Sequence, residues 1–201
     1  RALALVGARQ PESRRCPVVL DAFVAASFIG FIGAMLSADA VQRGRSLFAD
    51  REGDEIADPA LALADDGTDP GGPASAPFDG EGSPTRRTPL IGDGRLRTFL
   101  FDARTARKAG RATTGNAARG SYRSAPSVGT TNLVLEPGTL DLEGLFQEAG
   151  EGLFVTDVAG LHSGVNPVSG TFSVGASGRL IEGGAAGTPV GTAADTVRVC
   201  S

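Results

Sequence analysis

The chain has 201 residues, 41% of them hydrophobic, and a formal net charge of −4 at pH 7. This length suffices for one domain with a sizeable apolar core, or for one domain and a small appendage. Mean hydropathy near zero and 21% charged residues are typical of an ordinary soluble protein. Cys16 and Cys200 are too few to build a disulfide framework, so a reducing cytoplasm is the simplest location.

Residues 1–20 contain four arginines but no continuous apolar segment, so they do not predict a signal peptide. The chain begins with Arg1 and not with Met, so we expect the natural N-terminus to lie further upstream. The longest apolar run is residues 22–36, interrupted only by Ser27. It is shorter than the roughly 20 residues of a membrane span. We therefore predict a helix that is buried on nearly all sides rather than a membrane anchor.

Further along, residues 60–64 predict a strand that runs into a solvated turn at Asp65-Asp66-Gly67. The segments 89–91 and 96–101 flank Gly92-Asp93-Gly94, which predicts a hairpin. Asp102 then caps a short helix that Gly110 ends.

The C-terminal part of the chain mixes strands with one clear helix. Residues 132–135, 153–158 and 170–181 have strand-like patterns. Apolar residues at i, i+3, i+4 and i+7 predict an amphipathic helix; they are Leu142, Leu145, Phe146 and Ala149. The pattern as a whole predicts an α+β fold with mostly antiparallel strands.

Acidic and basic residues are separated along the chain. Residues 50–82 hold ten acidic side chains against Arg51, and residues 86–123 hold ten basic ones against Asp93 and Asp102. A basic stretch can attract nucleic acid. We do not expect nucleic-acid binding, because the chain is acidic as a whole and carries none of the familiar nucleic-acid-binding motifs. The alternative is that the basic stretch folds against the acidic one or lines a groove.

The residues themselves point to no enzyme chemistry. His162 is the only histidine, which excludes motifs that need two, such as the HExxH zinc site. There is no GxSxG nucleophile motif, and the spacing of Cys200 and His162 gives no support to a cysteine-hydrolase pair. A structural or surface role for His162 is the simpler interpretation.

Several segments together resemble a known family in their order and spacing. They are Val18-Val19-Leu20, Asp65-Asp66-Gly67-Thr68, Phe78-Asp79-Gly80-Glu81-Gly82, Arg86-Arg87, Leu90-Ile91, Ala103-Arg104, Thr114-Gly115-Asn116, Gly152-Leu153-Phe154-Val155-Thr156, the run from Gly164 to Ser173, Gly175-Ala176-Ser177-Gly178 and Ile181-Glu182. Over roughly residues 17–190 the chain resembles the C-terminal domain of the TldD/PmbA peptidase family.

This resemblance implies a strongly curved, mostly antiparallel sheet wrapped round a central buried apolar helix, here residues 22–36. It also implies a cytoplasmic, dimeric protein. In the family a zinc-bearing TldD subunit pairs with a metal-free PmbA/TldE subunit, and the pair cleaves unfolded or small peptides. The zinc branch carries HExxxH on the central helix and a downstream Cys ligand. Residues 27–34 offer no such ligand, which matches the metal-free branch.

The resemblance also sets expectations for organisation. Residues 1–16 are expected to be the remnant of a linker from a missing N-terminal domain, residues 17–190 the C-terminal-type domain, and residues 191–201 a divergent or truncated tail. No metal role is carried over to Cys200 in that tail.

For function, the resemblance implies a metal-free metallopeptidase subunit that is not catalytic alone. We expect no cofactor in this chain and zinc only in a TldD-like partner subunit. A self-dimer remains the alternative assembly. The alternative function is a non-catalytic peptide-binding or regulatory module, in line with the family's naming as a gyrase modulator.

No catalytic or metal-binding residue is assigned, but a substrate-binding loop is expected. Thr114, Gly115 and Asn116 fall where the zinc branch has a loop near its active-site cleft, and Arg119 can bind a peptide carboxylate or carbonyl. An adjacent free strand edge can add a peptide as an extra strand. The alternative is that these arginines only pair with the acidic stretch.

Overall fold

A computed structural model describes residues 8, 14–191 and 196–199 of the chain. The chain divides into two compact units, residues 1–28 with 139–201 (unit 1) and residues 29–138 (unit 2). Helix α1 (Ala22–Met35) contributes its first half to unit 1 and its second half to unit 2. None of the helices in the described residues has the length and hydrophobicity that a membrane crossing requires.

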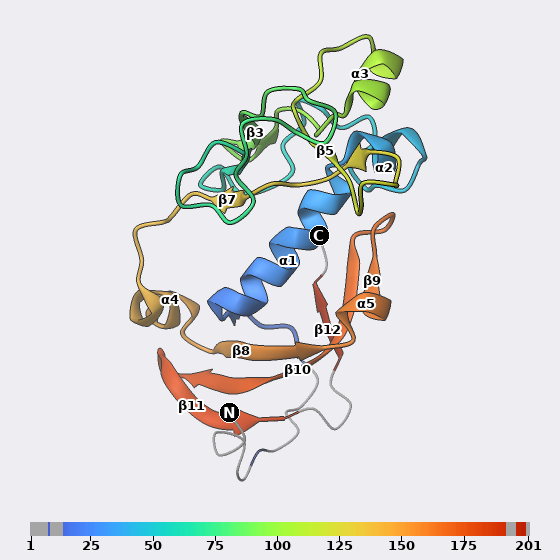
Figure 1. Cartoon of the computed structure of the whole chain (residues 1–201). Helices are drawn as coiled ribbons and strands as arrows, with labels where there is room; N and C mark the ends of the chain where they lie inside the picture. The colour runs from blue at the N-terminus through green and yellow to red at the C-terminus, as the bar shows by residue number, and fades with distance from the viewer. Residues whose placement is uncertain (1–7, 9–13, 192–195, 200–201) are drawn as a thin grey trace. The chain divides into compact units, whose positions relative to one another are not determined.

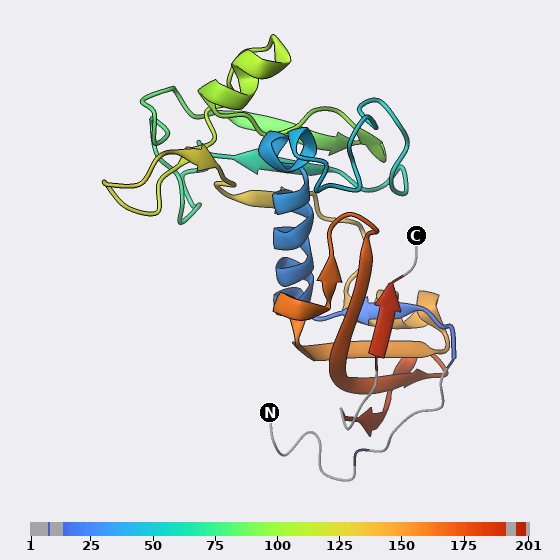
Figure 2. The same ribbon diagram turned by 90° about the vertical axis from the view of Figure 1, so that its right-hand side faces the viewer.

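Unit 1 is built on a curved sheet (Figures 1 and 2). Its elements besides α1 are β1 (Val18–Leu20), α4 (Leu142–Ala149), β8 (Gly152–Ala159), α5 (Leu161–Gly164), β9 (Val165–Asn166), β10 (Thr171–Glu182), β11 (Ala185–Val190) and β12 (Thr196–Val199). The strand order is β1-β8-β10-β11, and β9 and β12 also pair with β10. Only the β1–β8 pairing is parallel among these strands.

Strand β10 gives the sheet its curvature. Its register shifts against β8 between Ser177 and Gly178, and against β11 between Arg179 and Ile181. An extra residue in one strand bends that strand and increases its twist, and Figure 2 shows β10 sharply bent. The predicted α+β class and strongly curved, mostly antiparallel sheet are therefore confirmed.

Helix α1 confirms the predicted helix but not its predicted burial. The helix begins after Asp21, whose Oδ1 accepts a hydrogen bond from the Phe23 backbone N–H at 3.0 Å. Val24 packs with Val155 and Ala176 in unit 1. Burial on nearly all sides is not confirmed, because Phe23 is 76% exposed. An apolar composition shows that a helix has an apolar face, but not how much of its circumference is covered.

Unit 2 contains a four-stranded sheet, a two-stranded ribbon and two short helices. Its elements besides α1 are α2 (Ala38–Gln42), β2 (Leu63–Asp66), β3 (Arg87–Gly92), β4 (Arg95–Leu96), α3 (Ala103–Ala109), β5 (Ala117–Ala118), β6 (Ser127–Val128) and β7 (Leu133–Leu135). The sheet has the antiparallel order β4-β3-β2-β7, and β5 pairs with β6. Its core contains Leu36, Leu63, Leu90, Leu96 and Leu100, each 0–1% exposed.

Two local predictions in unit 2 are confirmed. Asp93 and Gly94 form the β3–β4 turn with φ of 52° and 69°, the left-handed geometry that a tight hairpin needs. Asp102 caps α3: its side chain accepts from the Thr105 N–H at 2.7 Å, and Gly110 ends the helix with φ 66°. Because α3 directly precedes the segment that holds the expected substrate loop, its end at Gly110 fixes where that segment begins.

Candidate functional site

The residues expected to bind substrate lie in unit 2 beside a small cavity of about 200 Å³. Gly115 and Asn116 line it directly, whereas Thr114 and Arg119 flank it in sequence. The remaining wall comes from the loop before β3, from β5 and from the segment after β6; its residues are Ala74, Ala76, Phe78, Asp79, Gly80, Thr85, Ala117, Ala118, Gly129, Thr130 and Thr131. The cavity therefore brings together segments that are far apart in the sequence.

Asn116 is 3% exposed and is held by hydrogen bonds within the chain. Its Nδ2 donates to Asp65 Oδ2 at 2.6 Å and to the Gly129 carbonyl at 3.2 Å. Its Oδ1 accepts from the Thr114 hydroxyl at 2.7 Å, and that hydroxyl accepts in turn from the Phe101 N–H at 2.8 Å. Because every polar atom of the amide already has a partner, Asn116 positions the loop around it.

Asp65 is the buried end of this network. It is 0% exposed, so the solvated turn predicted at Asp65-Asp66-Gly67 is wrong for this residue. Its carboxylate accepts from the Thr131 N–H at 2.7 Å and the Thr131 hydroxyl at 2.8 Å, besides Asn116. Among the described residues no cation lies within salt-bridge distance of it. Hydrogen bonds from neutral donors thus stabilise the buried charge.

Asp79 joins the loop before β3 to strand β5 at the cavity wall. Its Oδ1 accepts from the backbone N–H groups of Glu81 and Ser83, both at 2.9 Å, and its Oδ2 accepts from the Ala117 N–H at 3.0 Å. The Gly80 N–H donates to the Ala117 carbonyl at 2.7 Å. This role of Asp79 is not among the sequence-based predictions, although an Asp-Gly pair in a Pro-rich loop is a signal for side-chain-stabilised turns.

Gly115 and Arg119 complete the set of expected residues. Gly115 has φ 78°, and a Cβ there would overlap the Pro84 carbonyl oxygen, so only glycine fits. The Arg119 Nε donates to the Gly80 carbonyl at 2.7 Å and one terminal amine donates to the Ser124 carbonyl at 2.8 Å. Arg119 therefore ties the β5–β6 connection to the loop that contains Asp79.

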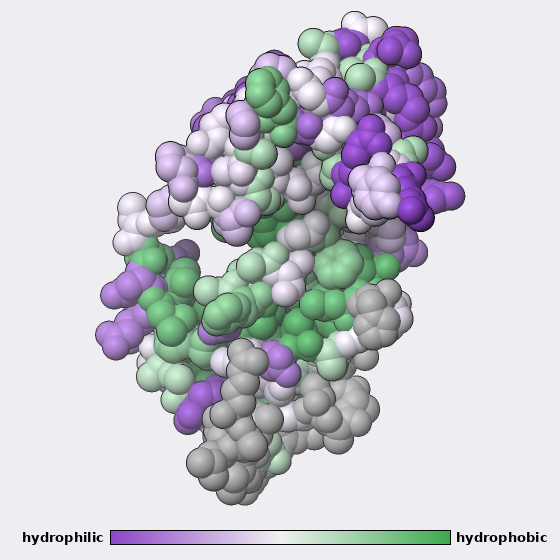
Figure 3. Space-filling model, viewed as in Figure 1, coloured by the Kyte–Doolittle hydropathy of each residue, from purple (hydrophilic) through white to green (hydrophobic). Residues whose placement is uncertain are grey.

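The acidic and basic stretches partly pair with each other, as the alternative interpretation expected. Arg95 contacts Glu55 at 3.1 Å, Arg111 contacts Glu52 at 2.7 Å, and Arg87 contacts Asp66 at 3.7 Å. The hydrogen bond that Arg111 donates to the Glu52 carboxylate raises the pKa of Arg111 above its ordinary value. Figure 3 shows hydrophilic residues gathered over α3, which carries Arg104, Arg107 and Lys108.

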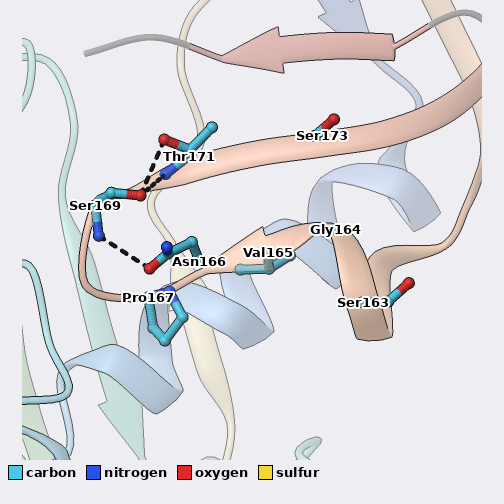
Figure 4. Close-up of a pocket in the computed structure, with 8 residues that line it drawn as sticks. All are labelled: Ser163, Gly164, Val165, Asn166, Pro167, Ser169, Thr171 and Ser173. Atoms are coloured by element: carbon cyan, nitrogen blue, oxygen red, sulfur yellow. Dashed lines mark hydrogen bonds between the residues drawn. The ribbon is translucent and has the colours of Figure 1, made fainter.

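A second, larger cavity of about 670 Å³ lies in unit 1, between α5 and the β9–β10 hairpin (Figure 4). Its lining is rich in hydroxyl groups, from Ser163, Ser169, Thr171 and Ser173. Asn166 Oδ1 accepts from the Ser169 N–H at 3.2 Å, and the Ser169 hydroxyl donates to the Thr171 hydroxyl at 3.0 Å. This wall lacks a charged side chain, so it offers hydrogen bonds but no acid, base or nucleophile pair.

The described residues of this chain do not fit a catalytic zinc ion. Helix α1 carries no His, Cys, Asp or Glu over Ala22–Met35. In the part of the chain that the structure describes, no three such side chains gather at metal-binding distance. The His162 side chain and Cys200 lie outside what is described. A three-ligand site of the zinc peptidase type therefore has no donor set among the described residues.

Comparison with known proteins finds a matching family model and several similar sequences. Residues 13–195 match the family model of the PmbA/TldA metallopeptidase C-terminal domain. The metalloprotease PmbA of Escherichia coli O157:H7 is 30% identical over 190 residues, which cover 94% of this chain and 40% of that protein. An uncharacterized protein of Methanocaldococcus jannaschii is 36% identical over 138 residues, covering 69% of this chain and 32% of its own length.

Solved structures of similar fold are also found. A proposed modulator of DNA gyrase from Thermotoga maritima has a TM-score of 0.86 and 34% identity, covering 94% of this chain and 43% of that one. TldE from Thermococcus kodakarensis has a TM-score of 0.81 and 28% identity, covering 91% and 42%. The chain thus spans about two fifths of the length of these structures.

Proposed function

Because the chain belongs to the PmbA/TldD metallopeptidase family, we propose that it is the metal-free component of a two-subunit peptidase, paired with a zinc-bearing TldD-like partner. Its relatives are named metalloproteases, yet the helix that bears HExxxH in the zinc branch here reads Ser27-Phe28-Ile29-Gly30-Phe31-Ile32-Gly33-Ala34. This one observation carries the proposal, since a metallopeptidase chain without zinc ligands needs a partner that supplies them.

In this proposal the chain contributes to peptide handling. The cavity lined by Gly115 and Asn116 is the proposed peptide contact, together with the flanking Thr114 and Arg119. Thr114 and Asn116 hold the wall by their mutual hydrogen bond, while Gly115 and the exposed parts of Arg119 are the groups that a peptide can reach. Sequence-tolerant binding of unfolded or small peptides fits a site made largely of backbone and small side chains.

The first experiment is co-purification of the full-length protein from its native cells, with zinc measured in each fraction. We expect a co-purifying chain that bears HExxxH, about one zinc ion per complex, and no stoichiometric zinc on this chain alone. The complex should cleave a fluorescence-quenched library of unstructured peptides. Substituting the HExxxH glutamate of the partner by glutamine should abolish cleavage and preserve assembly. One tightly held zinc ion on the isolated chain contradicts the proposal.

A second candidate is a self-sufficient, non-catalytic peptide-binding or regulatory module, acting as a self-dimer or alone. It is favoured by the structural likeness to the proposed gyrase modulator, at 34% identity. The same co-purification separates the two candidates. Recovery of this chain without any HExxxH-bearing protein, and with peptide binding but no cleavage, supports the module.

A further inference from the structure

The segment from Ala103 to Leu135 has an unbalanced charge. It contains no Asp or Glu, but six cations: Arg104, Arg107, Lys108, Arg111, Arg119 and Arg123. Arg104 is neutralised by Asp39 at 2.7 Å and Arg111 by Glu52 at 2.7 Å. Arg107 and Lys108 lie in the last turn of α3, where cations interact favourably with the helix dipole. Arg119 and Arg123 remain, on the β5–β6 connection.

This connection is a fixed loop. The Ser121 N–H donates to the Ser124 hydroxyl at 2.9 Å, and that hydroxyl donates back to the Ser121 carbonyl at 2.8 Å. Arg119 bridges the Ser124 carbonyl and the Gly80 carbonyl. Two of its nitrogens are thus occupied by the chain itself. Arg119 positions the loop, which Figure 2 shows projecting from unit 2.

Tyr122 and Arg123 form the exposed tip. Tyr122 is 82% exposed, and the Arg123 guanidinium carbon lies 5.0 Å from the centre of its ring. In the part of the chain that the structure describes, no carboxylate lies within salt-bridge distance of Arg123. Stacking on the ring orders the guanidinium while its N–H groups stay available. Tyrosine and arginine are also the residue types most enriched at binding hot spots.

The tip adjoins the cavity of about 200 Å³ through shared residues. Gly80, which accepts from Arg119, lines the cavity, and so does Ala118, the neighbour of Arg119. The lining is mostly small and apolar. The volume is below the range of about 300–1,000 Å³ that encloses a whole small-molecule ligand, so it suits a single side chain of a longer one.

We propose that this surface, the loop 119–124 with the adjacent cavity, selects acidic peptides: Arg123 binds a carboxylate and the cavity takes a neighbouring apolar side chain. The proposal rests on the peptide-handling role proposed above and names its substrate class. A carboxylate matches the planar fork of one guanidinium, with two parallel N–H···O bonds. A nucleic-acid strand instead requires many phosphates to be neutralised, and only one arginine at the tip is free.

The test uses two fluorescein-labelled octapeptides that differ only in Glu against Gln, with Leu beside the variable position. Binding to the purified full chain is followed by fluorescence anisotropy. We expect the Glu peptide to bind more tightly and Arg123→Gln to weaken it about tenfold, since a charged hydrogen-bonded pair is lost. The Gln peptide should change less than about twofold. Lys108→Gln is the matched control, because it removes one exposed charge from the same unit and should leave both affinities unchanged.

Three outcomes overturn the proposal: equal binding of the two peptides, an equal loss in the Lys108→Gln protein, or an unchanged affinity in Arg123→Gln. Tighter binding of a single-stranded oligo-thymidine with the same dependence on Arg123 assigns the surface to nucleic acid. Equal melting temperatures of the variants and the parent exclude unfolding as a cause. Because binding is measured without a partner subunit, failure here is distinguishable from failure of the co-purification.

Discussion

The Asn116 amide donates a 2.6 Å hydrogen bond to the buried carboxylate of Asp65, 51 positions earlier in the chain. This bond joins the loop after α3 to strand β2 of the four-stranded sheet. Thr131 supplies the other donors to the same carboxylate. The cavity wall is therefore held at one point by a buried charge that has only neutral partners.

Replacing Asn116 by alanine should destabilise unit 2 by about 2–3 kcal/mol, because a buried carboxylate loses a donor. Urea unfolding of the parent and Asn116→Ala measures this. Asn166→Ala is the matched control: the Asn166 side chain is hydrogen-bonded too, accepting from the backbone N–H groups of Val168 and Ser169, but it is exposed. The Asn166→Ala protein should lose less than about 1 kcal/mol of unfolding free energy. Unchanged stability of Asn116→Ala together with lost peptide binding would instead give Asn116 a direct contact with the ligand.

Phe28 and Phe23 provide a second test, since they lie on the same helix in different surroundings. The Phe28 ring lies 5.0 Å from the Phe172 ring, whereas Phe23 is 76% exposed. Phe28→Ala should cost about 2–4 kcal/mol, and Phe23→Ala should change stability by less than about 0.5 kcal/mol. Thermal melting of the two variants measures both changes in stability. A larger loss from Phe23→Ala means that a partner covers this face.

What the sequence predicts well is set by local chemistry. Asp102 and Gly110 bound α3 because an N-cap carboxylate and a left-handed C-cap glycine act within a few residues. The Asp93-Gly94 turn is predicted for the same reason. The prediction of a curved sheet came from the family resemblance, because no local sequence pattern indicates the curvature of a sheet.

What the sequence predicts poorly depends on contacts between distant segments. Asp65 looks like part of a polar turn, but Asn116 and Thr131 bury it. The predicted helix at α4 is confirmed and Phe146 is buried, yet Leu142 and Leu145 are 46% and 39% exposed. Figure 3 shows hydrophobic residues over this helix. Periodicity identifies an apolar face, but the chain's other segments decide how much of it is covered.

Gly178 and Gly30 make a third matched pair. A Cβ at Gly178 would overlap the Phe154 carbonyl oxygen in the adjacent strand, where β10 shifts its register. A Cβ at Gly30 meets nothing within 4 Å. Gly178→Ala should therefore destabilise unit 1 by about 1–3 kcal/mol, while Gly30→Ala should stabilise the helix by up to about 1 kcal/mol. Circular dichroism melts of both variants test this, and a neutral Gly178→Ala would show that the sheet can relax at its bend.

Asp39 gives the last prediction, a dependence on pH. Partial burial opposes its ionisation, but hydrogen bonds and charges from Arg43 at 2.8 Å and Arg104 at 2.7 Å outweigh it, so the pKa of Asp39 lies below its ordinary value. A carboxyl group whose pKa is lower in the folded state stabilises the fold above its unfolded pKa of about 3.9. That contribution is lost as the pH falls through the lower, folded value.

Asp39→Asn should accordingly lower stability by about 1 kcal/mol at pH 7, a modest amount because both arginines are more than half exposed. The difference from the parent should shrink towards zero as the pH falls below the lowered pKa of Asp39. Asp54→Asn serves as the control, since its pair with Arg51 is exposed and spans 3.5 Å; it should change stability little at either pH. A difference at Asp39 that persists undiminished in acid would show that the side chain acts through packing rather than through its charge.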